Sequence, residues 1–272
     1  MGIRNNWVFV MGVVLFALVV FAAIIGPALM SYDPNRNDIN QRLKPPLTPG
    51  HLLGTDALGR DLATRLIYGA RISMLMCSVS VLLGMIVGVA VGLIAGFAGG
   101  WLDAVLMRLV DIQLAFPFIL LALVIVTALP PSVPTLILLL SLSAWVLFAR
   151  TVRGSVLKEI NREYVHGAIV LGASRLRIAL KYVLPNLIPT IAVIASLELA
   201  ALIMFEATLS FLGVGIQPPT ASWGGMMLEG QTYMRSAWWI TTLPGIAIFL
   251  ATLSMNLVSE GLRDILDPRL QR

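Results

Sequence analysis

Long uncharged apolar segments constrain the fold of this chain more than any other feature of its sequence. Residues 7–30 contain no charged side chain, and 38 uncharged residues separate Asp111 from Arg150. A helix needs about 20 apolar residues to cross roughly 30 Å of hydrocarbon. With 58% hydrophobic and 12% charged residues, the chain could not bury its apolar surface in one water-soluble core. The sequence therefore predicts an integral membrane protein.

Helical spans account for these segments. Proline removes a backbone donor and clashes with the preceding turn, so Pro130, Pro131 and Pro134 divide the longest segment in two. The first segment exceeds the roughly 7–15 apolar residues of a signal peptide, and we interpret it as an uncleaved membrane anchor. Since helices satisfy their own backbone groups in lipid, we predict one all-α domain over residues 1–272 with six transmembrane helices. The predicted spans lie near residues 7–30, 72–97, 106–129, 134–149, 187–213 and 238–260.

The distribution of charge predicts an orientation. If the N-terminus is cytoplasmic, the inside segments carry 12 Arg and Lys residues and the outside segments carry seven, which is the bias expected of cytoplasmic segments. We therefore expect both termini and the loop 150–186 in the cytoplasm, and the loop 31–71 outside. The basic residues lie between apolar segments, so they indicate lipid headgroups rather than nucleic acid as the partner. One cysteine and two histidines argue against a metal cluster.

The second predicted span has a regular glycine pattern. Glycine recurs there at every fourth residue, a spacing that lets two helix backbones approach closely. The glycines are Gly84, Gly88, Gly92, Gly96 and Gly100. They pack either against a neighbouring span of the same chain or against another subunit.

Two carboxylates, Glu198 and Glu206, fall inside the fifth predicted span. Such groups are expensive in hydrocarbon and face the bundle interior or a water-filled path. Their separation of eight residues, about two turns, places them near the same face. They either line a pathway or gate for a polar solute or find partners within the protein, and Glu206 is the stronger candidate for the pathway.

Other polar and aromatic residues near the spans have simpler interpretations. Arg108 and Asp111 are one turn apart, a spacing typical of an ion pair on a helix surface. Trp223, near the outer end of the fifth span, is expected to be an aromatic anchor at the membrane interface.

The loop 150–186 contains a short amphipathic pattern. Small and apolar residues recur at helical spacing at Val165, Ala168, Ile169 and Gly172. Ser174 is a candidate N-cap for a second helix that ends near Pro185. The first helix either enters a cleft on a partner protein or lies along the membrane with its basic neighbours on lipid phosphates.

This loop resembles the EAA loop of bacterial ABC importer permeases. That motif reads Glu-Ala-Ala, three residues, Gly, nine residues, Ile, any residue, Leu-Pro. The spacing matches throughout, although His166 replaces Glu, Gly167 replaces Ala and Tyr182 replaces Ile. The resemblance implies a coupling helix that docks in a groove of an ATPase subunit. The residues implied in this contact are Glu163, His166, Gly167, Ala168, Gly172, Ala173, Leu184 and Pro185.

Further segments extend the resemblance over nearly the whole chain. Residues 51–61, 68–73, 206–215 and 217–224 are similar to segments of the C-type permeases of dipeptide and oligopeptide importers. This implies a type I importer bundle in the bacterial inner membrane, with a second similar permease, two cytosolic ATPase subunits and an external solute-binding protein as partners. ATP and Mg would bind to the ATPase subunits, and no cofactor to this chain. Di- or oligopeptides are the implied substrates, with nickel chelates, opines or other small solutes as alternatives.

Two rival functions follow from the residues alone. A secondary transporter driven by an ion gradient would use Glu198 or Glu206, and an intramembrane enzyme would need a catalytic constellation. The chain has no Gly-x-Ser-x-Gly or His-Glu-x-x-His sequence, and none of its three lysines follows a glycine as in a P-loop. Any ATP that drives this chain must therefore bind to another polypeptide.

Overall fold

The computed structural model describes residues 6–266, which form helices and loops with no β-strand in that range. The all-α prediction is confirmed. Arg4, Arg269 and Arg272, which belong to the inside basic residues counted above, lie outside the described residues. The elements are α1 (Asn6–Ile24), α2 (Gly26–Leu29), a short 3-10 turn (Ile39–Gln41), α3 (Leu62–Ala98), α4 (Gly100–Ala115), α5 (Phe118–Ala128), α6 (Val133–Glu159), α7 (Glu163–Val170), α8 (Arg175–Arg177), a π-helical segment (Ile178–Val183), α9 (Leu184–Phe211), α10 (Trp223–Gln231) and α11 (Trp239–Leu266).

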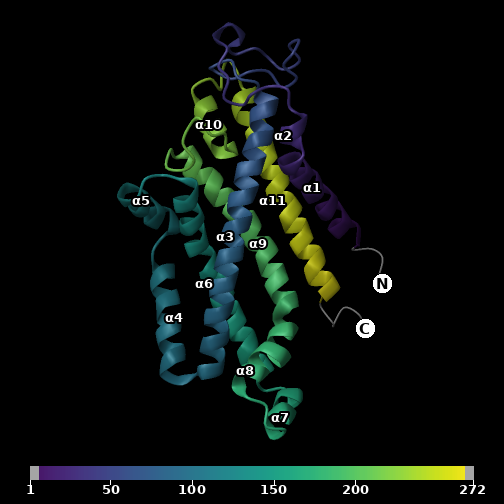
Figure 1. Ribbon diagram of the computed structural model, residues 1–272, viewed down its shortest axis with the longest axis vertical. Helices are drawn as coiled ribbons and strands as arrows, with labels where there is room; N and C mark the ends of the chain where they lie inside the picture. The colour runs from purple at the N-terminus through teal and green to yellow at the C-terminus, as the bar shows by residue number, and fades with distance from the viewer. Residues whose placement is uncertain (1–5, 267–272) are drawn as a thin grey trace.

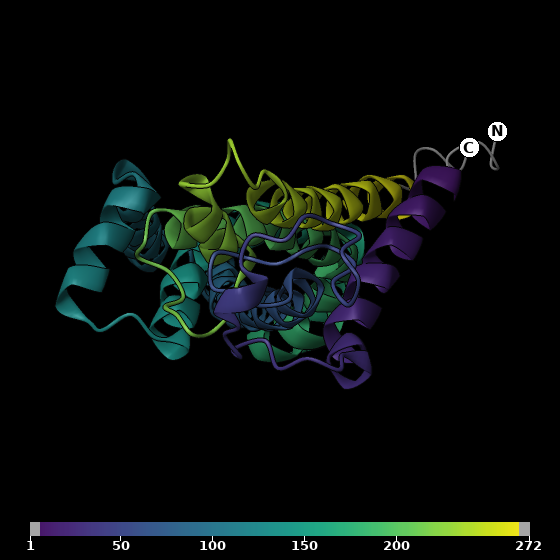
Figure 2. The ribbon, with the colours of Figure 1, turned by 90° about the horizontal axis from the view of Figure 1, so that it is seen from above.

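Four long helices form the centre of an elongated bundle. α3 packs along α6, α9 lies against α3, α6 and α11, and α1 crosses α11 on the outside (Figure 1). Seen from above, α1 and the α4–α5 pair lie at opposite ends of the bundle (Figure 2). Five helices, α1, α3, α6, α9 and α11, are long and apolar enough to span a membrane, and the bent α4–α5 pair makes a sixth when it is counted as one span.

The third predicted span is broken. The prediction of one helix near 106–129 is wrong, because α4 and α5 meet at an angle of 88°. Phe116 is extended, with φ −99° and ψ 128°, as expected of a residue that precedes proline. Pro117 then forms the N-cap of α5. This bend turns α5 away from α4 and shapes the cavity described below.

Several predicted boundaries also move. α3 begins ten residues before the predicted span 72–97, because the Asp61 carboxylate caps it by accepting from the Thr64 amide at 2.8 Å. The predicted outer loop 31–71 therefore includes a helical start. Ser174 caps α8 as predicted, but the helix does not stop near Pro185. It continues through the π-helical segment into α9, where Pro185 occupies the first turn and needs no amide donor.

The contact between α3 and α6 depends on glycine. A Cβ atom built on Gly84 would lie 2.6 Å from the Cβ of Ala144, and one on Gly92 would lie 2.7 Å from the carbonyl oxygen of Ala149. Gly88 and Gly96 face α6 in the same way. These four glycines therefore pack within the chain. The predicted fifth member, Gly100, begins α4 with φ +56°, and a Cβ atom built on it would meet no atom of another element within 4 Å.

Candidate functional site

The predicted coupling loop lies at the end of the bundle opposite the outer loop (Figure 1). Within α7, Val165 and Ala168 are buried against the bundle, whereas Ile169 is half exposed. Val170 and Leu171 at the tip are 86% and 88% exposed. Two members of the predicted stripe thus anchor α7, whereas its exposed tip consists of residues outside the stripe, and Gly172 lies beyond the end of the helix. Glu163, His166 and Gly167 also lie on the exposed side.

Glycine ends α7 at a defined point. Gly172 has φ +79°, its amide donates to Ile169 at 2.9 Å, and the Ala173 amide donates to Ala168 at 3.0 Å. This is the Schellman arrangement, in which a left-handed residue closes the last helical turn. Gly172 is therefore required by the backbone here. Gly167, by contrast, has helical geometry and open space around its missing Cβ.

Tyr164 ties α7 to two spanning helices. Its hydroxyl donates to the Glu159 carboxylate at the end of α6 at 2.6 Å, and it accepts from the Asn186 amide in α9 at 3.2 Å. A displacement of α7 would therefore act on α6 and α9 together. The loop spacing gave no sign of this connection, because it depends on side-chain geometry.

A π-helical segment joins the loop to α9. The amide of Leu184 donates to the carbonyl of Ala179, five residues back instead of four. Pro185 follows directly and has no amide to donate. The wider turn is consistent with the frequent occurrence of π-helical turns at functional positions. The Leu-Pro end of the predicted motif thus marks a change in helix winding at the start of α9.

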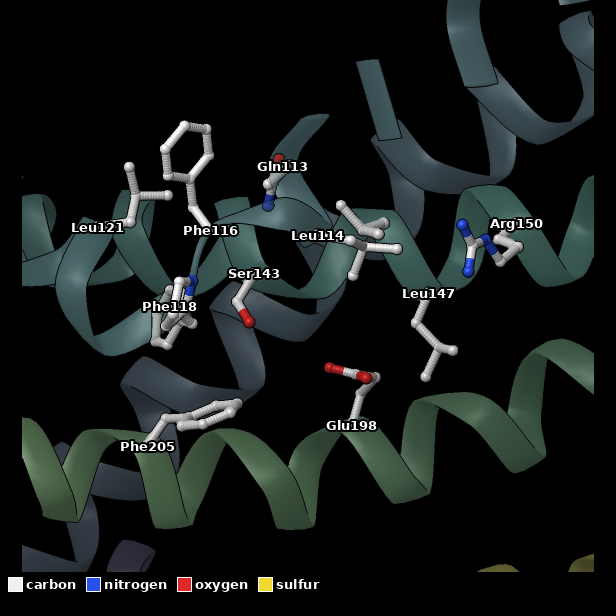
Figure 3. A pocket seen from close by; sticks show the side chains of 12 residues that line it. Gln113, Leu114, Phe116, Phe118, Leu121, Ser143, Leu147, Arg150, Glu198 and Phe205 are labelled. Carbon is white, nitrogen blue, oxygen red and sulfur yellow. The ribbon is translucent and has the colours of Figure 1, made fainter. Parts of the chain in front are cut away.

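A cavity of about 470 Å³ lies between the α4–α5 bend, α6 and α9. Its lining is mostly apolar, with four polar side chains. The lining residues are Gln113, Leu114, Phe116, Pro117, Phe118, Leu121, Ser143, Val146, Leu147, Arg150, Glu198 and Phe205. Glu198 projects into this space from α9, and Ser143 projects into it from α6 (Figure 3).

The two predicted pathway carboxylates have different surroundings. Glu198 lines the cavity, whereas Glu206 does not line it and is only 2% exposed. The Glu206 carboxylate accepts hydrogen bonds from Ser73 at 3.0 Å and Ser210 at 2.9 Å. It joins α3 to α9 within the packed interior. The preference for Glu206 as the pathway residue is therefore not supported by its position; of the two carboxylates, Glu198 is the one that faces a cavity.

The ion pairs near the cavity also differ from expectation. Asp111 pairs with Arg150 of α6 at 2.7 Å, so the predicted surface pair between Arg108 and Asp111 is wrong. Asp103 of α4 binds Arg153 through two hydrogen bonds of 2.6 Å. These pairs hold α4 beside α6, together with the apolar contact of Val110 with Val146 and Ala149.

A buried ionic network joins the outer loop to α10. Arg60 binds Asp56 at 2.6 Å and Glu229 at 2.6 Å, and Arg65 binds Glu229 at 3.0 Å. The local Asp56–Arg60 pair follows from spacing in the sequence. Glu229 was missed, because it lies more than 160 residues from its partners. Fully buried arginine is rare unless paired, and Arg65 is 1% exposed.

Trp223 is part of the same outer assembly. The prediction of an aromatic anchor at the membrane interface is wrong, since Trp223 is 2% exposed. Its indole nitrogen donates to the Leu66 carbonyl of α3 at 3.0 Å, and its ring lies against Gly69. Trp223 thus fixes the first turn of α10 to α3.

Comparison with known proteins connects this arrangement with transport. Residues 88–272 match the family model of binding-protein-dependent transport system inner membrane components. Residues 3–46 match the N-terminal transmembrane domain of oligopeptide transport permease C.

Curated relatives extend over almost the whole chain. The dipeptide transport system permease protein DppC of Escherichia coli is 43% identical over 99% of this chain and 91% of its own length. The di/tripeptide transport system permease protein DppC of Pseudomonas aeruginosa is 41% identical over 96% of this chain and 88% of its own length.

A solved structure supports the fold. The inward-facing MetNI methionine ABC transporter matches with a TM-score of 0.62 and 19% identity, over 74% of this chain and 96% of the compared chain. The resemblance found in the coupling loop and outer segments is therefore confirmed. This chain belongs to the binding-protein-dependent transport system inner membrane components, as a multi-pass permease subunit of an ABC importer.

Proposed function

We propose that this chain forms half of the translocation pathway of an ATP-driven importer for di- and oligopeptides. The observation that carries the proposal is α7, which projects from one end of the bundle with an exposed apolar tip and is tied to α6 and α9 through Tyr164. The names of its relatives in Escherichia coli and Pseudomonas aeruginosa favour peptides over nickel chelates or opines as the substrates.

The chain transmits force and does not itself hydrolyse ATP. Closure of two cytosolic ATPase subunits, which hold ATP and Mg, moves α7, and α7 moves the lower ends of α6 and α9. The cavity between these helices then changes its accessibility from the cytoplasm to the outside. A second, similar permease forms the other half of the pathway, and an external solute-binding protein delivers the peptide.

The same arrangement supports the proposed orientation. α7 belongs to the cytoplasmic side, and the loop 31–61 with α10 belongs to the outer side. The start of α1 lies against the end of α11, where Phe9 meets Gly261, which supports two termini on one side. Together with the bias in basic residues, this favours cytoplasmic termini in the inner membrane.

The decisive experiment substitutes Gly167 by Arg and asks whether ATPase subunits still bind. The chain would be coexpressed with the second permease and both ATPase subunits and purified through a tag on this chain. Gly167 has open space, so Gly167→Arg leaves α7 intact while enlarging its exposed side. Gly172→Arg is a poorer choice, since φ +79° would strain any other residue.

Gly154→Arg is the matched control, because Gly154 also has helical geometry and open space, within α6. We expect the control and the unchanged chain to retain the ATPase subunits, and Gly167→Arg to pair with the second permease but lose them. Retention of the ATPase subunits by Gly167→Arg would show that α7 is not the coupling helix. Peptide uptake that follows an ion gradient without ATP would favour the secondary transporter instead.

A further inference from the structure

One carboxylate in the cavity lacks a partner. Glu198 has no hydrogen-bond or ion-pair partner within residues 6–266, although its side chain is directed into the space that Ser143 and Arg150 also line (Figure 3). Glu206, two turns further along the same helix, is fully satisfied by serine hydroxyls. The chain thus provides partners for one intramembrane carboxylate and leaves the other open to the cavity.

Apart from Ser143, the other polar side chains of the cavity have partners within the protein, although Arg150 keeps guanidinium donors beyond its one bond. Arg150 forms its ion pair with Asp111 at 2.7 Å. Gln113 accepts from the Trp145 indole at 2.8 Å and donates to the Leu142 carbonyl. The groups of the cavity that can still accept a hydrogen bond from a solute are therefore the Glu198 carboxylate and the Ser143 hydroxyl, set among leucine and phenylalanine side chains.

An unpaired carboxylate in a membrane-spanning helix is expensive and marks a pathway when it faces a water-filled space. The group that best complements it is a cation with several hydrogen-bond donors. A volume of about 470 Å³ lies within the range of small-molecule sites. Such a cavity can take one or two residues of a peptide, with apolar walls for side chains and Glu198 for a charged end.

We infer that Glu198 and Ser143 form a transient subsite for an ammonium group of the peptide in transit. The inference rests on the proposed function, since it specifies how the pathway contacts its substrate. The ammonium donates to the Glu198 carboxylate and to the Ser143 oxygen, while the apolar wall of the α4–α5 bend lies beside the peptide side chains. The contact exists only while the cavity is open to the peptide, so the subsite is weak and passes the peptide on.

The test measures peptide binding to the complete, nucleotide-free transporter in lipid nanodiscs, without the binding protein, so that the specificity of that protein does not enter. Saturation-transfer NMR suits weak ligands. Three probes separate the sources of the ammonium group: alanylalanine has a free amino terminus, N-acetyl-alanyl-lysine has only a side-chain ammonium, and N-acetyl-alanylalanine has neither.

We expect N-acetyl-alanylalanine to bind at least about tenfold more weakly than alanylalanine, because acetylation removes a charge-assisted hydrogen bond. Retained binding of N-acetyl-alanyl-lysine would identify any ammonium group as the ligand, and its loss would restrict the subsite to the amino terminus. Glu198→Gln should weaken alanylalanine by a similar factor and abolish the effect of acetylation. Glu198→Asp, which keeps the charge, should preserve the discrimination between the two dialanine probes.

Equal binding of the acetylated and free dialanine by the unchanged transporter would overturn the inference, and this comparison needs no variant to fold. The inference would also fail if Glu198→Gln separated the two permeases while acetylation had no effect, since Glu198 would then pair with a basic residue of the second permease. ATP-dependent uptake of alanylalanine with the binding protein is measured in parallel. If uptake is normal, only the subsite is wrong; if there is no uptake, the proposed peptide transport is wrong.

Discussion

The close approach of α3 and α6 predicts a large cost for one added methyl group at Gly92. A Cβ atom there would lie 2.7 Å from the Ala149 oxygen, 2.8 Å from the Val152 Cβ and 3.0 Å from the Arg153 nitrogen. Two of these atoms belong to the backbone of α6, so no rotamer change relieves the overlap. The helices would have to separate by several tenths of an ångström to reach ordinary contact distance. A gap of that size would remove about a quarter to a half of the dispersion energy of each atomic contact along the interface.

Gly92→Ala therefore combines two opposing terms. Overpacking costs about 1–3 kcal/mol, and the rigid backbone places this site at the upper end. Alanine regains up to about 1 kcal/mol of helix propensity over glycine. Gly154→Ala receives the second term alone, because nothing lies within 4 Å of its missing Cβ. The two variants should differ in stability by about 3 kcal/mol, which is the steric cost by itself.

Thermal unfolding of the purified transporter, followed by tryptophan fluorescence, measures this difference. At about 2–4 °C per kcal/mol for a chain of this size, Gly92→Ala should unfold roughly 6–12 °C below Gly154→Ala. Equal midpoints for the two variants would refute the close packing of α3 on α6. The glycine pattern would then belong to another interface, such as one with a second subunit.

Other predictions concern the outer network and the start of α9. Glu229→Gln should lower the free energy of unfolding by about 2 kcal/mol. This is less than for a fully buried ion pair, because the Glu229 side chain is 26% exposed. An unchanged unfolding temperature would contradict the ionic network with Arg60 and Arg65. Trp223→Phe removes the hydrogen bond to the Leu66 carbonyl and should lower the free energy of unfolding by about 1–2 kcal/mol in the same assay. Unchanged stability would show that the Trp223 indole does not bond α3. Pro185→Ala restores an amide donor, so the π-helical turn should rewind and rotate α7 by about 100° relative to α9. ATPase subunits should still bind, but ATP hydrolysis should no longer drive peptide uptake; full coupled uptake would show that the π-helical turn has no role in coupling.

Local sequence patterns were sufficient for most of the helical architecture and for the short helix in the loop 150–186. Apolar runs and proline breaks predict which segments enter the membrane. The free energy of transferring a segment from water to lipid depends mainly on the residues of that segment alone. Small-residue spacing likewise predicted a helix at α7, but it placed Gly172 within that helix, whereas Gly172 follows its end with φ +79°. A left-handed residue is needed to close that helix, and the requirement is met within six residues of chain.

The role of each charged residue depended on the packed structure. Glu198 and Glu206 differ by about 80° around α9 when successive residues turn by about 100°. That rotation is enough to direct Glu198 into the cavity and Glu206 toward the serines of α3 and α9. The assignment depends on which helices surround α9. Spacing within α9 contains no information about its neighbours.

Interactions between residues far apart in the sequence also depend on how the helices pack. Glu229 meets Arg65 across 164 residues of sequence, and the indole of Trp223 meets Leu66 across 157. Neither pair leaves a periodic signal along the chain, because each depends on how α10 folds back onto the start of α3. Hydropathy is a property of a segment and can be read locally. The direction of a side chain into a cavity or an ion pair is a property of several segments packed together, and it exists only once they are in contact.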